Sequence, residues 1–543
     1  MLRRIFSVIL AVILVLLTFS SCSSGEDETF YYPIFSDPVS FDPQIASDNA
    51  SKIVVFNCFE GLVKVDKDGK IVPGVAEKWE VSNDGLVYTF RLRQDARWFV
   101  SEKAAKLLGS EASANFDYRV TAHDFVYGLK RAFDKNMGAS TDSRLYSIKN
   151  SYEVYSGLKD QDELGVTALD AKTLQIELEK PNDDFLKALT QSAAMPCREE
   201  FFEATKGRYG LDPDKVIYNG PFYLYSWNTG INLTMYRNDN YSGRSEVKPS
   251  AVYLYVNENL ETRVDKIEDG TYDACPLSSG QKKRVDNDKV SYLNYNNSTL
   301  GFAFNCANEV MKNYDMRTAL TSALDVSSIP LTENGTSYAD GIVPGICMIG
   351  NSFYRGYSGK TGYPKPDEAK AKMHLEKAFE ALEVDRVQIN IICQKDFENT
   401  VKIAVQSWQK MLGINVNFTV EPLDEMALEK RVRSGDYAMA FTKITAQSES
   451  AVAFLGLFTS VGTNNIFLMK SKSYDSLMGA SKEALSQDGI ISNCISAEKY
   501  LINKSVFIPV FYEDGYLAMA KDVSEIYGIE AGTIPVFMYG IRK

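Results

Sequence analysis

The sequence predicts a mixed α/β (α+β) protein with more than one domain, and three observations support this prediction. The chain has 543 residues, 45% of them apolar and 24% charged, which is a globular composition with room for two or three domains. Residues 218–305 are rich in strand-like alternation of apolar and polar side chains. Residues 387–420 then follow a strand, helix, strand order with short links, which predicts a parallel βαβ unit.

The first predicted elements are a hairpin and a capped helix. Asn83-Asp84-Gly85 is a hairpin-type turn, and residues 87–92 alternate as a strand does. Thr121 predicts the start of a helix, because Asp124 stands where a capping box places its carboxylate. The polar and alanine-rich residues 101–119 predict a loop or a short surface helix. The predicted apolar face of the helix consists of Phe125, Leu129 and Phe133.

The middle of the chain is dominated by predicted strands. Residues 166–178 indicate a strand, a turn and a second strand. Asn219-Gly220-Pro221 has the residues of a turn, and it leads into an aromatic strand, residues 222–227. Residues 233–237 and 252–256 alternate in the same way, so this part of the chain predicts a sheet.

The later part predicts helices between strands. Residues 367–382 place an apolar face on one side of a helix, and residues 387–391 alternate as a strand. A second helix ends at Gly413, and residues 416–420 form the next strand. Ligands of open α/β sheets sit beyond the carboxyl ends of such strands. The two helical faces consist of Met373, Leu375, Ala378, Phe379 and Leu382, and of Val401, Val405, Trp408 and Leu412.

Composition argues against several classes of function. The formal charge of −12 disfavours nucleic-acid binding, which needs clustered Lys and Arg to neutralise phosphates. His123 and His374 are the only histidines, so a histidine-based catalytic triad or metal site is not expected. No GxSxG or HExxH motif occurs, and the cysteines are scattered without a CxxC pair. The sequence therefore predicts a protein that is not an enzyme, with no metal and no cofactor.

The first residues predict export. Met1 to Arg4 are followed by an apolar run over residues 5–19, which is short for a membrane span. Ser20-Ser21-Cys22 resembles a bacterial lipobox, in which a lipid is attached to the cysteine; Phe19 departs from the usual Leu. We therefore expect a lipoprotein signal peptide over residues 1–22, a lipid on Cys22 and a flexible tether over residues 23–29. The alternative is plain cleavage to a soluble secreted protein.

Motifs spread along the chain resemble family 5 of the bacterial extracellular solute-binding proteins, the oligopeptide- and dipeptide-type receptors of ABC importers. They occur in the same order as in that family and span nearly the whole mature chain. They are Asp42-Pro43, Phe59-Glu60-Gly61-Leu62-Val63, residues 73–80, 84–93 and 121–131, Asn219-Gly220-Pro221-Phe222, Arg237-Asn238, residues 269–273, Phe304-Asn305, Arg317, Ala323-Leu324-Asp325 and Leu412-Gly413-Ile414.

The resemblance implies a two-lobed, periplasmic-binding-protein-like type II fold with an extra domain inserted in the first lobe. It also implies a hinge where the chain crosses between the lobes, near Phe304-Asn305 and near residues 508–512. The implied domains are lobe I at 30–80, 215–300 and 509–543, inserted domain II at 81–214, and lobe II (domain III) at 301–508.

The resemblance also implies a binding site. In the peptide-binding members, a Trp is followed three residues later by an Asp that pairs with the free ammonium of the peptide. Ile444 stands at the Trp position here and Gln447 at the Asp position, with Thr445 and Ala446 between them. A neutral amide cannot balance an ammonium, and losing one partner of a buried charge pair costs about 2–5 kcal/mol. Either Glu449 supplies the carboxylate from a shifted loop, or the ligand has no free amine at that point.

Three further residues match positions that line the cleft in the family. Tyr146 matches a tyrosine of the inserted domain that touches the peptide backbone, and Ala46 and Ser47 lie on the first-lobe loop. The implied partners are a peptide or peptide-like ligand, the transmembrane subunits of an ABC permease, and the outer face of the cell membrane through the lipid. We expect a monomer. A non-peptide solute, or a surface sensor or adhesin without import, is the alternative.

Overall fold

The structure is a computed structural model. It describes residues 28–137, 143–182, 185–256, 259, 262–331, 337–349, 352–359, 365–446, 448–462, 465–484 and 487–543. The predicted signal peptide, Cys22, most of the predicted tether and Gln447 lie outside the described residues. No helix in the described part of the chain is both long enough and apolar enough to cross a membrane.

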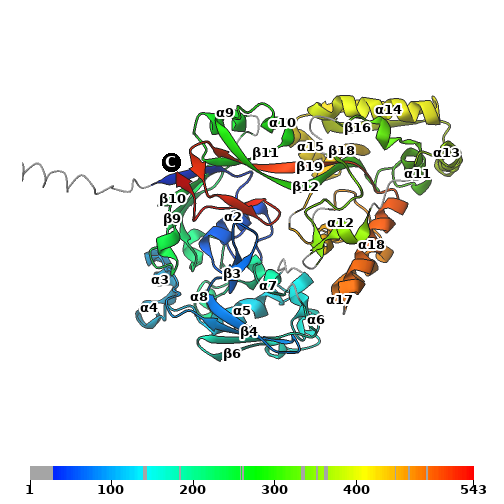
Figure 1. Cartoon of the computed structure of the whole chain (residues 1–543). Helices are drawn as coiled ribbons and strands as arrows, with labels where there is room; N and C mark the ends of the chain where they lie inside the picture. The colour runs from blue at the N-terminus through cyan, green and yellow to red at the C-terminus, as the bar shows by residue number, and fades with distance from the viewer. Residues whose placement is uncertain are drawn as a thin grey trace, which may run out of the picture.

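Three sheets organise the molecule (Figure 1). The first has the order β1-β10-β9-β8, with β1 parallel to β10 and the other neighbours antiparallel. Its turn at Asn219-Gly220-Pro221 is held against the end of α2, because the Asn219 amide bonds to both backbone groups of Glu60. A Cβ on Gly220 would come within 2.5 Å of the Phe59 nitrogen, so glycine allows this close approach. The bounds are β1 (Thr29–Pro33), α2 (Asn49–Cys58), β8 (Phe222–Asn228), β9 (Asn232–Arg237) and β10 (Ala251–Tyr255).

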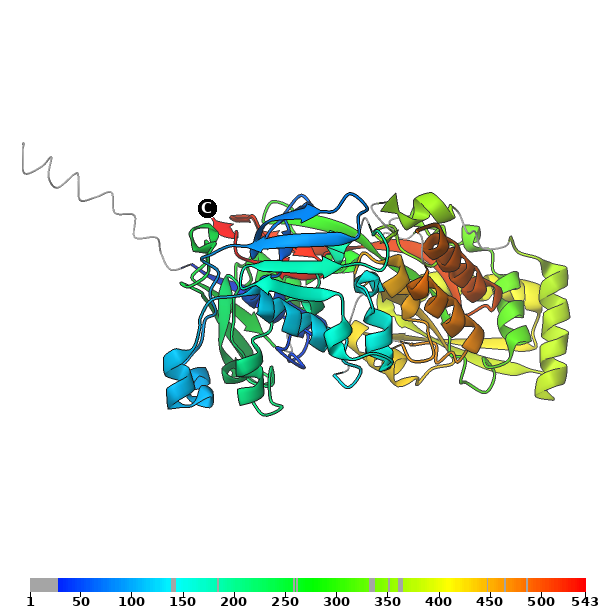
Figure 2. The same ribbon diagram turned by 90° about the horizontal axis from the view of Figure 1, so that it is seen from below.

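The second sheet, β4-β5-β7-β6, is antiparallel throughout, and α5 packs on it (Figure 2). The predicted hairpin at residues 83–85 and the predicted capped helix are confirmed: the Thr121 N–H donates to the Asp124 carboxylate at 2.7 Å. Residues 101–119 contain two short helices. The bounds are β4 (Ala76–Val81), β5 (Val87–Leu92), α3 (Glu102–Leu108), α4 (Ser110–Asn115), α5 (Ala122–Ala132), α6 (Ser151–Ser156), β6 (Val166–Asp170), β7 (Thr173–Glu177), α7 (Phe185–Ala188) and α8 (Glu199–Ala204).

The third sheet has seven strands, in the order β11-β19-β12-β18-β16-β17 with β13 paired to β19. The predicted βαβ unit is confirmed, since β16 and β17 are parallel neighbours joined by α14. The prediction for Met373 is wrong: it is 44% exposed, because only the Leu375 and Ala378 side of α13 meets the core. The bounds are β11 (Ala274–Leu277), β12 (Val290–Phe304), β13 (Ser337–Tyr338), α13 (Glu368–Leu382), β16 (Val387–Gln394), α14 (Glu398–Leu412), β17 (Val416–Leu423), β18 (Met439–Thr445) and β19 (Phe507–Ala520).

The other elements are short hairpins and the helices around the third sheet. The small strands are β2 (Val63–Val65), β3 (Ile71–Pro73), β14 (Met348–Ile349), β15 (Ser352–Phe353), β20 (Val523–Ser524), β21 (Tyr527–Ile529), β22 (Ile534–Val536) and β23 (Ile541–Arg542). The helices are α9 (Arg263–Glu268), α10 (Ser279–Lys282), α11 (Tyr314–Ala323), α12 (Tyr354–Ser358), α15 (Glu425–Ser434), α16 (Ala451–Gly456), α17 (Lys472–Glu483) and α18 (Gln487–Asn503).

The paired strands β12 and β19 connect two hydrophobic cores. Val290 and residues 516–520 belong to the core beneath the first two sheets, whereas Leu300 and Ile508 belong to a core of the third sheet. The pairing register shifts between Tyr295 and Ser298, at the point where the strands leave one core for the other. Figure 1 shows both strands running side by side across the molecule. They divide it into a first lobe, which carries the second sheet, and a second lobe.

Candidate functional site

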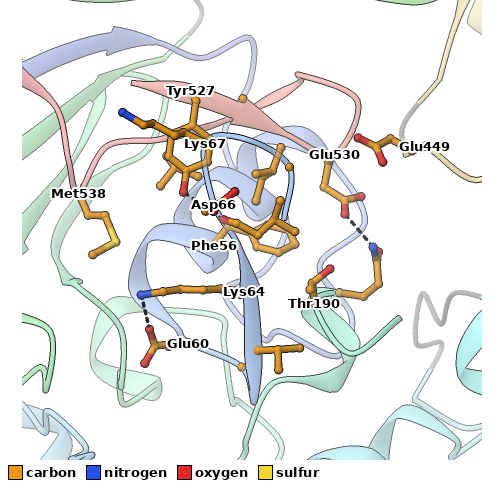
Figure 3. A pocket seen from close by; sticks show the side chains of 18 of the residues that line it. Phe56, Glu60, Lys64, Asp66, Lys67, Thr190, Glu449, Tyr527, Glu530 and Met538 are labelled. Atoms are coloured by element: carbon orange, nitrogen blue, oxygen red, sulfur yellow. Dashed lines mark hydrogen bonds and ion pairs between the residues drawn. The ribbon is translucent and has the colours of Figure 1, made fainter. Parts of the chain in front are cut away.

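We call the part of the chain from β4 to α8 the second-sheet region. A cavity of about 450 Å³ lies where the first lobe, the second-sheet region and the second lobe meet (Figure 3). Its walls come from the end of α2 and the β2–β3 hairpin, from α7 and the residues after it, from β12 and from the segment around β21 and β22. Glu449 is the residue that lines it from the second lobe beyond β12. The cavity therefore lies at the contact between the lobes.

One side of the cavity carries a buried carboxylate, Glu60. Its Oε1 accepts hydrogen bonds from the Lys64 ammonium at 3.0 Å and the Tyr241 hydroxyl at 2.5 Å. Burial, and next the charge of Glu60, raise the pKa of Tyr241 well above its usual value, so this hydroxyl stays protonated. Burial alone would lower the pKa of Lys64, but the Glu60 carboxylate, together with Tyr539 and Glu246, raises it, and the net shift is upward. Lys64 is therefore charged at neutral pH.

The opposite side joins three parts of the chain. Lys187 of α7 forms an ion pair with Glu449, and the exposed fractions of their side chains are 22% and 33%. Four residues further along, the Gln191 amide donates to Glu530 Oε1 at 2.9 Å. The Glu449 carbonyl accepts from the Met348 N–H at 2.6 Å, which ties Glu449 to the second lobe. One short segment of the second-sheet region thus contacts a carboxylate of the second lobe and a carboxylate of the C-terminal segment.

The first-lobe and inserted-domain residues predicted to bind ligand do not line this cavity. Ala46 is buried in the first-lobe core, and the exposed Ser47 precedes α2. Tyr146 is half-buried, with its ring edge-on to Phe133 at 5.3 Å and to Tyr155 at 5.9 Å. Burial raises the pKa of Tyr146, so its hydroxyl stays neutral. Their predicted contact with a ligand stays a prediction.

The predicted segment of the second lobe runs along β18 toward the cavity. Ile444 pairs with Thr299 and is buried, and the Thr445 hydroxyl lies 2.9 Å from that of Ser298. The Ala446 N–H donates to the Asn297 carbonyl at 2.8 Å. The side chains of Ile444 and Ala446 pack in the second lobe, so within the described part of this segment Glu449 is the residue that reaches the cavity.

The sequence reasoning did not identify Lys187, Gln191 or Glu530. No local motif marks them, and Gln191 and Glu530 are 339 residues apart in the chain. The backbone conformation, in contrast, marks the segment of Glu530. Glu530, Ala531 and Gly532 have left-handed φ of +51°, +58° and +79° in succession. Successive left-handed residues are costly unless the surroundings fix them, and such strain is concentrated at functional sites.

The remaining reactive groups lie apart from the cavity. The seven described cysteines are free thiols; Cys306 is partly exposed and the others are buried. His374 lies 2.6 Å from an Asp315 carboxylate oxygen, between α13 and α11. No cluster of three metal-ligating side chains occurs among the residues that the structure describes.

Comparisons with known proteins agree with this architecture. A model of the family described as bacterial extracellular solute-binding proteins, family 5, matches residues 70–465. The dipeptide-binding protein DppE of Bacillus subtilis is 28% identical over 90% of this chain and 87% of its own length. The oligopeptide-binding protein AmiA of Streptococcus pneumoniae is 27% identical over 98% of this chain and 92% of its own.

Among solved structures, peptide-bound OppA of Listeria monocytogenes has a TM-score of 0.74 at 25% identity, covering 95% of this chain and 99% of that one. Two structures of the murein tripeptide binding protein MppA, both 22% identical and matched over 95% of this chain, have TM-scores of 0.72 and, for the unliganded open form, 0.57.

Proposed function

This chain belongs to family 5 of the bacterial extracellular solute-binding proteins, and from this premise we propose that it captures oligopeptides or a peptide-like solute outside the cell and delivers them to an ABC permease. The observation that carries the proposal is the cavity of about 450 Å³ at the contact between the lobes. Pockets for small ligands have roughly this size, about 300–1,000 Å³. The names of DppE, AmiA and OppA, which state dipeptide or oligopeptide binding, support a peptide as the ligand.

Capture works through the equilibrium between an open and a closed arrangement of the lobes. A ligand that contacts both lobes binds the closed form better and shifts the population toward it. The strand pair β12 and β19 is suited to be the hinge, because its register shift at Tyr295 and Ser298 lies between the two cores. An extended peptide can pair its backbone with a strand edge, while water fills its side-chain pockets.

The cavity walls suit a zwitterionic solute. Glu60, Glu449 and Glu530 offer carboxylates, and Lys64, Lys67 and Lys187 offer ammonium groups. A peptide has charges of both signs at its ends, so both kinds of group are needed to replace the water it loses. Among the described residues that were expected to contact the ligand, we favour Glu449, because it lines the cavity. The others expected to do so are Ala46, Ser47, Tyr146, Ile444, Thr445, Ala446 and Gln447.

We also propose that a lipid on Cys22 anchors the monomeric receptor to the outer face of the membrane. The anchor would hold it near its permease and raise the effective concentration of the two partners. Radiolabelled palmitate that enters the wild type and not the Cys22→Ala variant would support this assignment.

Mass spectrometry of solutes that co-purify with the exported protein tests the main proposal. We expect short peptides, released on unfolding and rebound by the refolded protein with heat release in calorimetry. Recovery of a single non-peptide solute that the protein rebinds would replace the peptide proposal by the alternative. No heat with a random pool of tripeptides to hexapeptides would overturn it.

A further inference from the structure

A buried carboxylate oxygen without a hydrogen-bond donor lies in the wall of the cavity, and it belongs to Glu530. The side chain is 7% exposed, and its Oε1 accepts from the Gln191 amide. Its Oε2 is buried and has no hydrogen-bond partner among the described residues. Lys52 Nζ lies 3.6 Å from this oxygen, which balances charge but is too long for a hydrogen bond. A charged oxygen in this state is costly, so a donor from a ligand would stabilise it.

The backbone around Glu530 is fixed in an unusual conformation. Glu530, Ala531 and Gly532 have φ of +51°, +58° and +79°. The ring of Tyr295 occupies the space where a Cβ on Gly532 would stand, with its atoms 2.2 Å away, and the Tyr295 hydroxyl accepts from the Gly528 N–H at 3.0 Å. The turn is thus held by β12, the strand that also joins the lobes. A carboxylate on such a turn is positioned before any ligand arrives.

A second carboxylate, Glu449, approaches the same end of the cavity from the other lobe. Lys187 contacts Glu449, and Gln191, four residues further along the chain, contacts Glu530. Figure 3 shows the two carboxylates on one side of the cavity. Opening of the lobes would separate Glu449 from Lys187, whereas Glu530 and Gln191 both stay with the first lobe. Glu530 is therefore available in both arrangements, and Glu449 joins it on closure.

We propose that Glu530 binds a cationic N–H donor of the solute, an ammonium or guanidinium group, and that this contact makes the receptor prefer ligands with a positive charge at this end. The inference rests on the proposed function and names the charge of its ligand. A cationic donor fits best because charge-assisted hydrogen bonds to carboxylates are roughly twice as strong as neutral ones. Glu449, which is paired with Lys187, lines the same cavity.

The test measures which members of one pool the receptor retains. The pool contains the tripeptides Ala-Lys-Ala, Ala-Arg-Ala, Ala-Met-Ala and Ala-Gln-Ala, each with a free and with an acetylated amino end, and native mass spectrometry reports the bound fraction. We expect the wild type to prefer cationic members over the acetylated Met and Gln members. Glu530→Gln should lose about 30-fold or more for members that carry an ammonium or guanidinium group, and less than about threefold for the acetylated Met and Gln members, which carry neither. Glu177→Gln removes an exposed carboxylate of β7 and should change neither.

Each outcome separates the two proposals. If the wild type retains no peptide, the proposed function fails. If it retains peptides without preferring cationic members, or if Glu530→Gln weakens members with and without a cationic group equally, the role of Glu530 is overturned while peptide binding stands. Glu530→Gln keeps the volume and the acceptor for Gln191, so we expect it to fold. Should it not fold, Glu530→Asp, which keeps the charge and shortens the side chain, must weaken cationic members selectively.

Discussion

Two of the ion pairs that join the second-sheet region to the rest of the molecule differ in burial. On its first-lobe side, Arg131 of α5 pairs with Asp42 at 2.5 Å, and the side chains are 6% and 2% exposed. On its second-lobe side, Lys187 pairs with Glu449, and these side chains are 22% and 33% exposed. Both pairs join segments that are distant in the chain, yet only the first is sealed from water.

The ion pair between Arg131 and Asp42 is enclosed by further buried contacts. Its guanidinium also donates to Gln44 Oε1 at 2.6 Å and lies 4.1 Å from the centroid of the Phe202 ring. Gln44 in turn donates to the Met195 carbonyl at 2.9 Å, so the pair belongs to a buried network. Lys187 and Glu449 have no comparable enclosure. We therefore expect the second-sheet region to stay with the first lobe, and the partly exposed contact between Lys187 and Glu449 to break when the lobes open.

The largest expected effect follows from breaking the buried pair. Asp42→Ala leaves the Arg131 charge buried without its carboxylate, and such changes cost about 3–5 kcal/mol in the free energy of unfolding. Urea unfolding followed by tryptophan fluorescence measures this. Asp117→Ala, which breaks the surface pair with Arg119, should cost less than about 1 kcal/mol. Equal effects of the two variants would mean that burial does not distinguish the contacts.

A smaller effect on stability, with a visible effect on shape, is expected at the second contact. Lys187→Met should change the free energy of unfolding by less than about 1 kcal/mol. The pair is partly exposed, so water can replace each partner when the pair is broken. It removes an attraction that only the closed arrangement makes, so the unliganded protein should open and its radius of gyration in X-ray scattering should rise. Lys149→Met, which breaks the exposed pair with Glu177, is the matched control. An unchanged radius in Lys187→Met would show that this pair does not hold the lobes together.

Local physics explains which parts of the fold the sequence could predict. The capping of α5 at Thr121 and the β16-α14-β17 unit depend on neighbours within a few residues, and both are confirmed. The face of α13 was misjudged at Met373, because periodicity does not say how wide the covered stripe is. The structural role of Gly220 was also nonlocal, since its close contact is with the end of α2.

The candidate site was harder to predict because its members meet only through the tertiary fold. Glu449 was named from the family resemblance, and it lines the cavity. Lys187 and Glu530 belong to segments without a motif, and their proximity depends on how three parts of the chain close together. No periodicity or spacing rule carries that information. The unpartnered oxygen of Glu530 becomes visible only when every donor around it has been placed.

Salt separates the two contacts without any substitution. The Debye length falls from about 10 Å at 0.1 M to about 3 Å at 1 M ionic strength, which screens exposed charges and leaves buried ones almost untouched. We expect the scattering radius of the unliganded wild type to approach that of Lys187→Met at 1 M sodium chloride. Lys187→Met itself should change little with salt. If both proteins expand equally, the response comes from charges other than this pair.

The smallest effect is expected in the reactivity of Cys197, which lies 3.3 Å from an Arg131 nitrogen at the buried contact. Burial raises the pKa of this thiol to about 12, although the neighbouring Arg131 lowers it, so at pH 8 it is protonated and shielded. Labelling with a maleimide, followed by peptide mass spectrometry, should therefore be slow at Cys197 in the wild type. It should be equally slow in Lys187→Met, because opening of the lobes leaves the first contact intact, and faster in Asp42→Ala. Faster labelling in Lys187→Met would mean that the two contacts open together. The second-sheet region would then not stay with the first lobe when the lobes open.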